Sequence, residues 1–535
     1  MAPVDTAAAA LTNALPIALF AGHALLVTGL SANVLRTARR AAKSLPPSTR
    51  TRSQSPLRRR NATIFSALAF VSLASVTTFA VIWRAISYIQ WAEQGNHETP
   101  GSLWTGWYGT GEEGLGRWHL GDWIKDIDLT HELDTVAVLR PEGFLYTSQH
   151  FVGLIASAIF MGIEGHRRSL SSSTIASFVI LSATGSLGYA LSLFFVTILY
   201  TPLTVHKSDA PLRDALFTPR PAVYDILIVT SLLSLNAFPG FLKQGGDVRF
   251  LRLGYLAIPL LFAYAPKIVP LRLGIQHNTK ASAHRSYTKV YHALSIASFL
   301  LYWRLVTTNI FANTPPEPSY IWDVFTNAIG KNDASRTNRV LSGLSITGQK
   351  LKHISAHPAV SVTSLDVLFT TISLLAWTFT RNLDVDDVLE SSVLSFLVPK
   401  HEKHVSFEND TTPSQNHESE SEAPVKTTPR KGGRSNKSST TASSPLPSAL
   451  TSRLRRGTRG QGRNADYGSD NDSTYQPSPA TKRDVAEMET DGASTTGDLV
   501  HAGESTALTL FLAFLGGLGQ LAAGALGAEV AGPRE

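Results

Sequence analysis

Apolar segments about 20 residues long recur along this chain, and charged residues, proline or glycine bound each of them. A helix rises about 1.5 Å per residue, so a segment of this length crosses a hydrocarbon core of roughly 30 Å. The apolar windows cover residues 12–35, 64–83, 144–164, 175–200, 223–242, 250–270, 290–311, 361–380 and 506–528. This pattern predicts an all-α fold, a polytopic transmembrane helix bundle of about eight spans with a ninth near the C-terminus.

Shifts in composition divide the chain into four predicted parts. Residues 1–60 hold the first span and a basic loop, and residues 61–399 hold the main bundle with an aromatic-rich loop at 89–143. Residues 400–504 are rich in Ser, Thr, Pro, Asn, Lys and Arg. Such a segment buries too little apolar area to offset its ordering entropy, so it is predicted to be a disordered tail. Residues 505–535 are predicted to form a C-terminal hydrophobic helix.

The basic residues predict an orientation in the membrane. Nine Lys and Arg between residues 36 and 60 mark a flexible cytoplasmic loop by the positive-inside rule. Counting spans from there places the basic residues at 167–168 and at 243–252 in the cytoplasm as well. The same count places five Lys and Arg at 267–289 in the lumen, against the rule. Either the proline-rich window 250–270 is re-entrant, or the rule is overridden in this loop.

Several kinds of chemistry lack the residues that they need. The chain has no cysteine, which excludes disulfides and thiolate sites. It also has no GxxxxGK[ST], HExxH or GxSxG string and no His and acidic residues at metal-ligand spacing, so no cofactor and no metal are expected. The net charge of +7 lies mainly in loops and tail, so the lipid bilayer, rather than nucleic acid, is the expected partner.

The loop at 89–143 is unusually rich in tryptophan. Trp104, Trp107, Trp118 and Trp123 lie close together in the sequence. Tryptophans often form a belt at the level of the lipid headgroups, and a lid over a cavity is the alternative. The second half of the loop has apolar residues spaced among acids, which predicts a short amphipathic helix lying on the membrane.

Four ionisable side chains, His150, Glu164, Asp225 and Asp366, lie within or at the ends of predicted spans. An ionisable group at membrane depth is costly, so each is a candidate functional residue, although a group near a helix end can also reach headgroups and water. Asp366 lies about one turn inside its apolar window and is the hardest to explain in that way. The predicted topology places Asp366 and Glu164 toward the cytoplasm and His150 and Asp225 toward the lumen. The two pairs should then lie most of a bilayer apart.

An acidic string, DVDD at 384–387, follows the span that contains Asp366. It matches the DxDD form with which class II terpene cyclases protonate an alkene or epoxide, and a solvated charge cluster after a span is the alternative. Cyclisation through a carbocation needs a carboxylic acid kept protonated, a dry cavity, and aromatic faces that stabilise positive charge. A proton-coupled carrier would use the same buried carboxylates.

Four stretches of the chain carry a family resemblance. They read WHLGDWIKDIDL, GFLYTSQHFVGLIASAIFMGIEGHRR, SLGYALSLFFVTILYTP and SLDVLFTTISLLAW. Together they resemble the fungal membrane-bound terpene cyclases of meroterpenoid pathways, of the ascofuranone and macrophorin type, over roughly residues 60–400. The resemblance implies cyclisation of a farnesylated aromatic substrate, begun by protonating a terminal epoxide or alkene without a metal.

The leading hypothesis is therefore a terpene cyclase of the endoplasmic reticulum or another endomembrane, acting on a prenylated small molecule. Asp366 is the favoured proton donor and Glu164 the second candidate, while Asp225 and His150 form the rival pair on the other side. The alternative is a non-catalytic membrane protein, either a proton-coupled carrier or a scaffold. The sequence does not indicate which proteins would be its partners.

Overall fold

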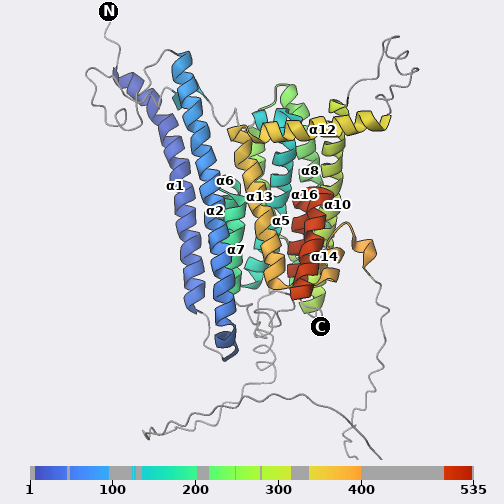
Figure 1. Ribbon diagram of the computed structural model, residues 1–535. Coiled ribbons are helices and arrows are strands. Elements are labelled where there is room, and N and C mark those ends of the chain that lie inside the picture. The colour runs from blue at the N-terminus through green and yellow to red at the C-terminus, as the bar shows by residue number, and fades with distance from the viewer. Residues whose placement is uncertain are drawn as a thin grey trace, which may run out of the picture. The chain divides into compact units, whose positions relative to one another are not determined.

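The computed structural model describes residues 6–44, 49–95, 123–124, 126–127, 135–201, 216–247, 249–277, 280–314, 336–398 and 499–532. Its principal helices are α1 (Thr6–Ser44), α2 (Thr49–Gln94), α5 (Pro141–Arg167), α6 (Ser172–Thr184), α7 (Leu187–Tyr200), α8 (Pro221–Lys243), α9 (Arg249–Ile268), α10 (Lys280–Asn313), α12 (Arg336–Ser355), α13 (Pro358–Arg381), α14 (Val385–Glu390) and α16 (Leu499–Ala531) (Figure 1). Short 3-10 turns lie at Leu271–Leu273 and Ser395–Leu397. Two short strands, β1 (Phe217–Pro219) and β2 (Gly274–Gln276), pair antiparallel, with Phe217 opposite Gln276.

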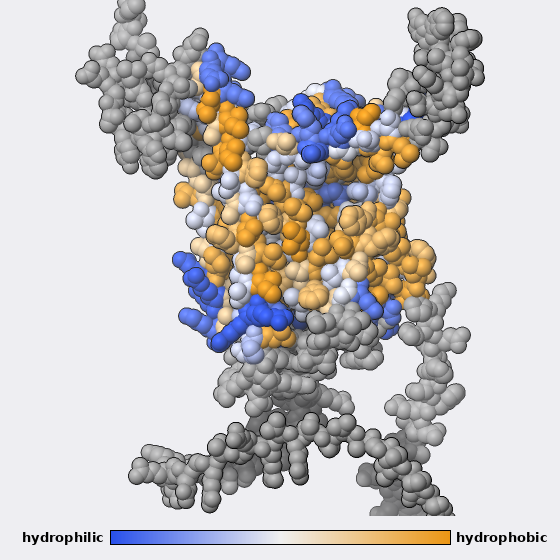
Figure 2. Space-filling model, in the orientation of Figure 1, coloured by the Kyte–Doolittle hydropathy of each residue, from blue (hydrophilic) through white to orange (hydrophobic). Residues whose placement is uncertain are grey.

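The predicted all-α membrane bundle is confirmed. Within the described residues, seven helices are long and apolar enough to cross a membrane by length and composition alone, namely α2, α5, α8, α9, α10, α13 and α16, although α16 is interrupted at Gly516 and Gly517. Figure 2 shows apolar side chains over the middle of the visible face and polar side chains toward its two ends, as a bilayer requires. The windows 175–200 and 506–528 were predicted to be continuous spans. Both predictions are wrong, because each window folds into a hairpin.

The window 175–200 is broken near its middle. α6 ends and α7 begins on either side of a turn at residues 185–186. The rings of Phe178 and Phe194, at similar distances from that turn, lie 5.0 Å apart, so the two helices run antiparallel. Arg168, just before α6, donates a hydrogen bond to a carbonyl in the last turn of α7, so both outer ends lie together. α6 and α7 form what we call the first hairpin, which enters the bundle and returns to the same end.

α16 also folds back on itself. Gly516 and Gly517 have non-helical torsion angles, and the φ of +73° at Gly517 is a conformation that favours glycine. The side chain of Leu512 lies 2.8 Å from the position that a Cβ on Gly524 would take. In a straight helix these two residues would be roughly 18 Å apart. The segments before and after the glycines are therefore the two arms of a second hairpin.

α9 lies along α5 and runs in the same direction. Near the start of α5, Tyr255 Oη donates to Thr147 O over 2.8 Å. Just beyond its end, Lys267 Nζ donates to Leu170 O over 3.4 Å. The C-terminal ends of the two helices therefore lie together.

This arrangement corrects the predicted orientation. The basic residues at 167–168 and at 267–289 share one end of the bundle, which we call the basic end, and those at 243–252 lie at the opposite end. The window 250–270 crosses the bundle despite its prolines, whereas 175–200 is the re-entrant segment. Because one predicted crossing is a hairpin, every later span crosses the membrane in the opposite direction from the one predicted by counting spans. The positive-inside rule then places the basic end, including 267–289, in the cytoplasm, and the basic residues at 243–252 become the exception to the rule.

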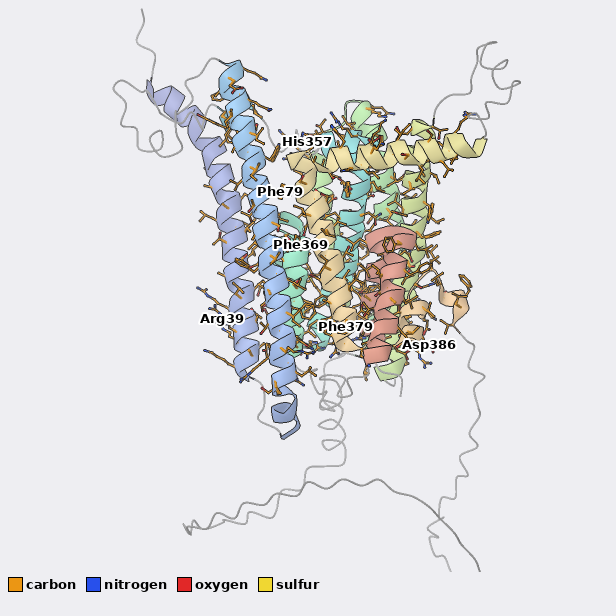
Figure 3. All side chains as sticks on the ribbon, viewed as in Figure 1. Arg39, Phe79, His357, Phe369, Phe379 and Asp386 are labelled. Carbon is orange, nitrogen blue, oxygen red and sulfur yellow. The ribbon has the colours of Figure 1, made fainter. Side chains whose placement is uncertain are left out.

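Other predicted boundaries also change. The basic segment 36–60 is helical up to Ser44 and again from Thr49, so the prediction of a flexible loop is wrong for most of it. Its Arg, Lys, Ala and Leu residues are good helix formers and extend the two spans. Figure 3 shows Arg39 of α1 and Phe379 of α13 at the same end of the bundle. Of the predicted tail, residues 400–498 lie outside the described residues, and the last helix already begins at Leu499.

The described part of the aromatic loop is a small aromatic cluster at the end of α2. The ring of Trp123 lies 5.7 Å from that of Tyr88, and Trp91 Nε1 donates to Asp126 Oδ2 over 3.2 Å. Trp104, Trp107 and Trp118 lie outside the described residues, as does most of the predicted amphipathic helix. The belt and the lid therefore both stay predictions.

The two hairpins have similar surroundings. In chain order α2 and α5 precede the first hairpin, whereas α10, α12, α13 and α14 precede the second. The turn strings match, GSLG at 185–188 and GGLG at 516–519. A Cβ on the last glycine of either string would meet the hydroxyl of a serine at 2.8 Å, Ser72 on α2 or Ser298 on α10.

Candidate functional site

Asp366 of α13 is buried, and both of its carboxylate oxygens accept hydrogen bonds from the first hairpin. Ser186 Oγ and Gly188 N donate to Oδ1 over 2.7 and 2.9 Å. Leu187 N donates to Oδ2 over 2.7 Å. The first N–H groups of a helix have no partner inside that helix, and lipid offers none. Asp366 therefore satisfies the N-terminus of α7 within the membrane.

The break between α6 and α7 exposes these donors. Ser186 is the N-cap of α7, with an extended backbone, and its Oγ accepts from Tyr189 N over 3.2 Å. A Cβ on Gly188 would lie 2.8 Å from Ser72 Oγ and 3.1 Å from Thr370 N. Only glycine lets α7 approach α2 and α13 so closely. The string GSLG thus supplies both the turn and the close approach that the site needs.

His150 of α5 provides the fourth hydrogen bond to Asp366. Its Nε2 lies 3.0 Å from Asp366 Oδ2. The imidazole ring stacks on Tyr255 of α9, with centroids 5.9 Å apart and planes 16° apart. The hydrogen bond from Tyr255 Oη to Thr147 O fixes this ring in turn. The pair is therefore a direct contact between two ionisable side chains, both of them buried in the bundle.

The structure therefore regroups the four predicted candidates. His150 was predicted to lie on the opposite side from Asp366, and this is wrong, because the two form a direct contact. Glu164, the predicted companion of Asp366, lies 14 residues beyond His150 on α5, which is roughly 21 Å along the helix. The prediction failed because the span count assigned depths without knowing that the intervening segment is a hairpin.

Glu164 is buried, and it is held by two arginines of its own helix. Arg167 Nη1 donates to Glu164 Oε1 over 2.8 Å, and Arg168 Nε donates to Oε2 over 3.2 Å. Both guanidinium groups are buried as well. A carboxylate in two ion pairs is poorly suited to donate a proton, so Glu164 reads as a structural residue.

The two arginines also tie both hairpins to α5. Arg167 Nη1 donates to Val530 O over 3.0 Å, at the end of the second hairpin. Arg168 Nη1 donates to Ile198 O over 3.4 Å and also to Thr201 O, at the end of the first hairpin. Cations at helix C-termini complement the partial negative charge of the last carbonyls. One helix therefore anchors both re-entrant segments at the basic end.

Asp225 of α8 lies apart from the other three candidates. Its neighbour Tyr224 packs on the ring of Tyr287. The guanidinium carbon of Arg167 lies 5.5 Å from the centroid of that tyrosine ring. Asp225 is therefore near the basic end, because α8 starts there, and the prediction that it lies on the opposite side of the membrane from Glu164 is wrong. Its Oδ1 is buried and, among the residues that the structure describes, has no hydrogen-bond partner.

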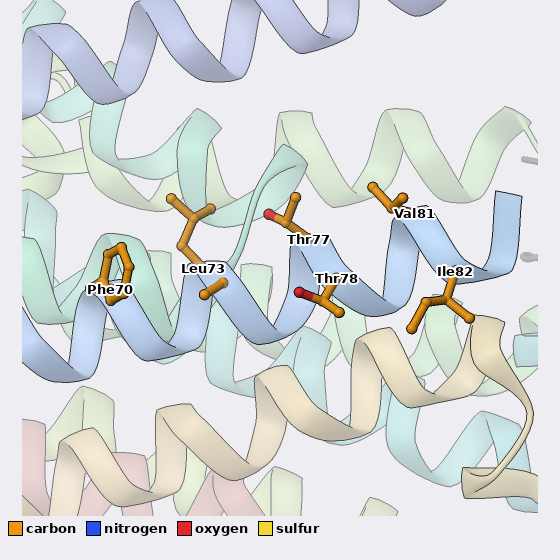
Figure 4. A pocket seen from close by; sticks show the side chains of 7 residues that line it. Phe70, Leu73, Thr77, Thr78, Val81 and Ile82 are labelled. Carbon is orange, nitrogen blue, oxygen red and sulfur yellow. The ribbon is translucent and has the colours of Figure 1, made fainter. Parts of the chain in front are cut away.

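An apolar groove of about 450 Å³ runs along α2 (Figure 4). Phe70, Leu73, Ala74, Thr77, Thr78, Val81 and Ile82 line it. Phe70 is 71% exposed, so the groove lies on the outer surface of the bundle. It contains none of the four candidate residues, and a lipid chain can occupy such a surface.

The acidic string at 384–387 has a local structural role. Asp384 caps α14, and its side chain accepts a hydrogen bond from Asp386 N over 3.0 Å. The acids of the first turn also complement the partial positive charge of the helix N-terminus. Within the described ranges, no three His, Asp or Glu side chains gather where they could hold a metal ion.

The sequence does not indicate the partners of Asp366 on the first hairpin or the position of Gln149. Gln149 is buried beside His150 and lies against Gly517 at the turn of the second hairpin. The available signal was the pair of matching strings, GSLG and GGLG, each interrupting an apolar window. Glycine inside such a window can indicate a break as well as a helix contact.

Comparison with known proteins gives no match for this chain: no family model, no curated protein and no solved structure is similar to it.

Proposed function

We propose that this protein is a membrane carrier coupled to protons, with the His150–Asp366 pair as the proton site. The observation that carries the proposal is a buried ionisable pair at the turn of a broken, re-entrant helix. In secondary transporters, sites for substrates and coupling ions lie near the bilayer centre at discontinuous helices, between internal repeats. Asp366 and its four hydrogen-bond partners come from α13, α5 and the N-terminus of α7, so a change in protonation alters how those helices contact one another.

Protonation provides a physical switch for the first hairpin. An ionised Asp366 accepts four hydrogen bonds, two of them from backbone N–H groups. A neutral carboxylic acid accepts such bonds less strongly, because charge-assisted hydrogen bonds are about twice as strong as neutral ones. Uptake of a proton therefore loosens the contact between α13 and α7, which is the kind of two-state contact that alternating access requires.

Replacing His150 by phenylalanine tests the proposal that the protein is a proton-coupled carrier. The variant keeps a ring to stack on Tyr255 but has no titratable nitrogen. Vesicles holding the wild-type protein and an entrapped pH-sensitive dye should acidify inside when succinate, glutamate, glucose or choline is supplied outside at acid pH. We expect His150→Phe to reduce this solute-driven acidification to the rate of protein-free vesicles.

Tyr255→Phe is the matched control, because it loses the hydroxyl bond to Thr147 O and keeps the stacked ring. Its acidification rate should stay close to that of the wild type. If wild-type, His150→Phe and protein-free vesicles acidify equally with all four solutes, the carrier proposal fails.

A terpene cyclase is the second candidate function, and Asp225 favours it. Asp366 uses both oxygens as acceptors, whereas Asp225 Oδ1 has no hydrogen-bond partner in the described part of the chain. A carboxyl group in that setting could protonate the epoxide or alkene of a farnesylated substrate in an endomembrane. Membranes containing the protein should then cyclise an epoxyfarnesyl phenol, and Asp225→Asn should abolish the product. Equal product yield from the variant would exclude Asp225 as the acid.

A further inference from the structure

α12 lies across the end of the bundle opposite the basic end, instead of crossing the bundle (Figure 1). It packs on the last turns of α10, where Asn313 Nδ2 donates to Thr347 Oγ1 over 3.1 Å. A Cβ on Gly343 would lie 2.9 Å from Ile310 O, so glycine lets the two helices approach closely. These contacts fix α12 at the level where the α10 span ends.

One face of α12 is buried against the bundle, and the face beside it is apolar and exposed. Thr347 and Ile354 are buried, whereas Val340, Leu341 and Leu344 are 41%, 56% and 51% exposed. Residues three and four apart lie on one side of a helix, so these three side chains form a single stripe, which we call the apolar stripe of α12. Contiguous exposed apolar side chains mark a surface that contacts another apolar phase or molecule.

The adjoining surface of α10 indicates that this apolar phase is lipid. Phe311 lies in the last turn of α10, between Ile310 and Asn313, and its side chain is 67% exposed. α10 is long and apolar enough to cross a membrane, so an exposed ring on it faces the bilayer. Because α12 packs on the same turn of α10, the apolar stripe lies at the depth where acyl chains meet headgroups.

The charges of α12 are all positive. The helix contains Arg336, Arg339, Lys350 and Lys352, and it contains no Asp or Glu. Lys352 is exposed and lies three turns beyond Leu341 on the same side of the helix, at the edge of the apolar stripe. A lysine in this position extends its aliphatic chain along the apolar surface and keeps its ammonium group among headgroups.

Other cations lie at the same end of the bundle. Lys243 ends α8, Arg249 and Arg252 belong to the first turn of α9, and all three are exposed. They are the basic residues that the positive-inside rule does not explain. Clusters of Lys and Arg next to membrane spans bind anionic lipid headgroups, which gives these cations and those of α12 a common partner.

We propose that α12 lies in the surface of the bilayer and binds the headgroups of anionic phospholipids. Its apolar stripe enters the acyl chains, Lys352 contacts phosphate groups, and the cations at 243–252 favour the same lipids at this end. Amphipathic helices bind membranes through buried apolar area together with attraction between their cations and anionic lipid. The inference is independent of the proposed carrier, because it involves no residue of the proton site.

The chain has no cysteine, so a single introduced cysteine can be labelled in the full-length protein. Leu344→Cys lies in the apolar stripe, and Gln349→Cys lies on the exposed polar side of α12. Each variant receives an NBD dye and is reconstituted into phosphatidylcholine vesicles at low ionic strength. A fixed fraction of phosphatidylglycerol or of phosphatidylcholine carries nitroxide-labelled acyl chains, which quench the dye on contact.

We expect strong quenching of the dye at 344 and weak quenching of the dye at 349. The apparent local concentration of phosphatidylglycerol at 344 should exceed that of phosphatidylcholine by about fivefold, because of the cations of α12. High salt should reduce this preference by screening. Equal quenching of the two dyes, or no quenching at 344 because another protein copy covers the stripe, overturns the inference.

Lys352→Gln in the Leu344→Cys background tests the cation. It should reduce the phosphatidylglycerol preference by about twofold or more, because one positive charge beside the anionic surface is lost. Lys43→Gln is the matched control, because Lys43 is an exposed lysine in the last turn of α1, at the basic end. The control should keep the preference of the parent protein. Equal local concentrations of the two lipids, or the same preference in Lys352→Gln and Lys43→Gln, would refute binding of anionic headgroups by α12.

Discussion

Asp366→Asn is expected to destabilise the protein and to abolish solute-driven acidification. The asparagine side chain keeps one acceptor oxygen but turns an NH₂ group toward donors such as Leu187 N or Gly188 N. Removing one partner from a buried charged network costs roughly 3–5 kcal/mol. The unfolding temperature in detergent should fall, and acidification of variant vesicles should match that of protein-free vesicles.

A double-mutant cycle separates the His150–Asp366 contact from the contacts of Asp366 with the first hairpin. Because His150 makes only one of the four hydrogen bonds, Asp366→Asn should remain more destabilising than His150→Phe. The coupling between the two substitutions should lie at about 0.5–3 kcal/mol, as for directly interacting residues. Purely additive effects would mean that the two side chains do not interact in the folded protein.

Glu164→Gln, at the basic end, is expected to lower the free energy of unfolding by a similar amount. The substitution leaves the buried guanidinium groups of Arg167 and Arg168 without their shared carboxylate. Loss of one partner from a buried ion pair costs roughly 3–5 kcal/mol, because the remaining charges stay desolvated. The same arginines bind carbonyl groups at the ends of both hairpins, so we also expect the hairpins to detach locally. Thermal unfolding and hydrogen exchange of residues 187–201 and 518–531 measure the two effects.

Glu93→Gln is the matched control, because Glu93 is an exposed glutamate near the end of α2. Surface substitutions of this kind usually change stability by no more than about 0.5 kcal/mol. An unfolding temperature for Glu164→Gln that equals that of Glu93→Gln would show that the arginine network does not hold the hairpins.

Glu164 and Asp366 illustrate two different uses of a buried carboxylate. The first neutralises fixed cations on its own helix, with partners three and four residues away. The second satisfies a helix N-terminus that belongs to a segment about 180 residues distant. A local charge cluster can be anticipated from sequence, because residues three and four apart share a helix face. A contact such as that of Asp366 cannot be anticipated in this way, because its partners lie far away in the sequence.

Several properties of this protein follow from the sequence alone. Apolar windows of about 20 residues determine that helices form and that they lie in a membrane, because both depend on local composition and length. The same windows singled out His150 and Asp366, since a titratable group among apolar residues is conspicuous in any arrangement. The absence of cysteine likewise excludes disulfides and thiolate chemistry in every fold.

Only the tertiary structure shows which apolar windows cross the bundle and which fold back as hairpins. Whether a helix continues through Gly-Ser or Gly-Gly depends on whether distant groups satisfy the N–H groups that a break exposes. At residues 185–186 that group is Asp366, supplied by α13, and no hydropathy window contains this information. The break then inverts every later span, which is why the span count misplaced His150 relative to Asp366 and put loop 267–289 on the wrong side. Composition determines which segments enter the bilayer, whereas long-range hydrogen bonds determine which of them cross it.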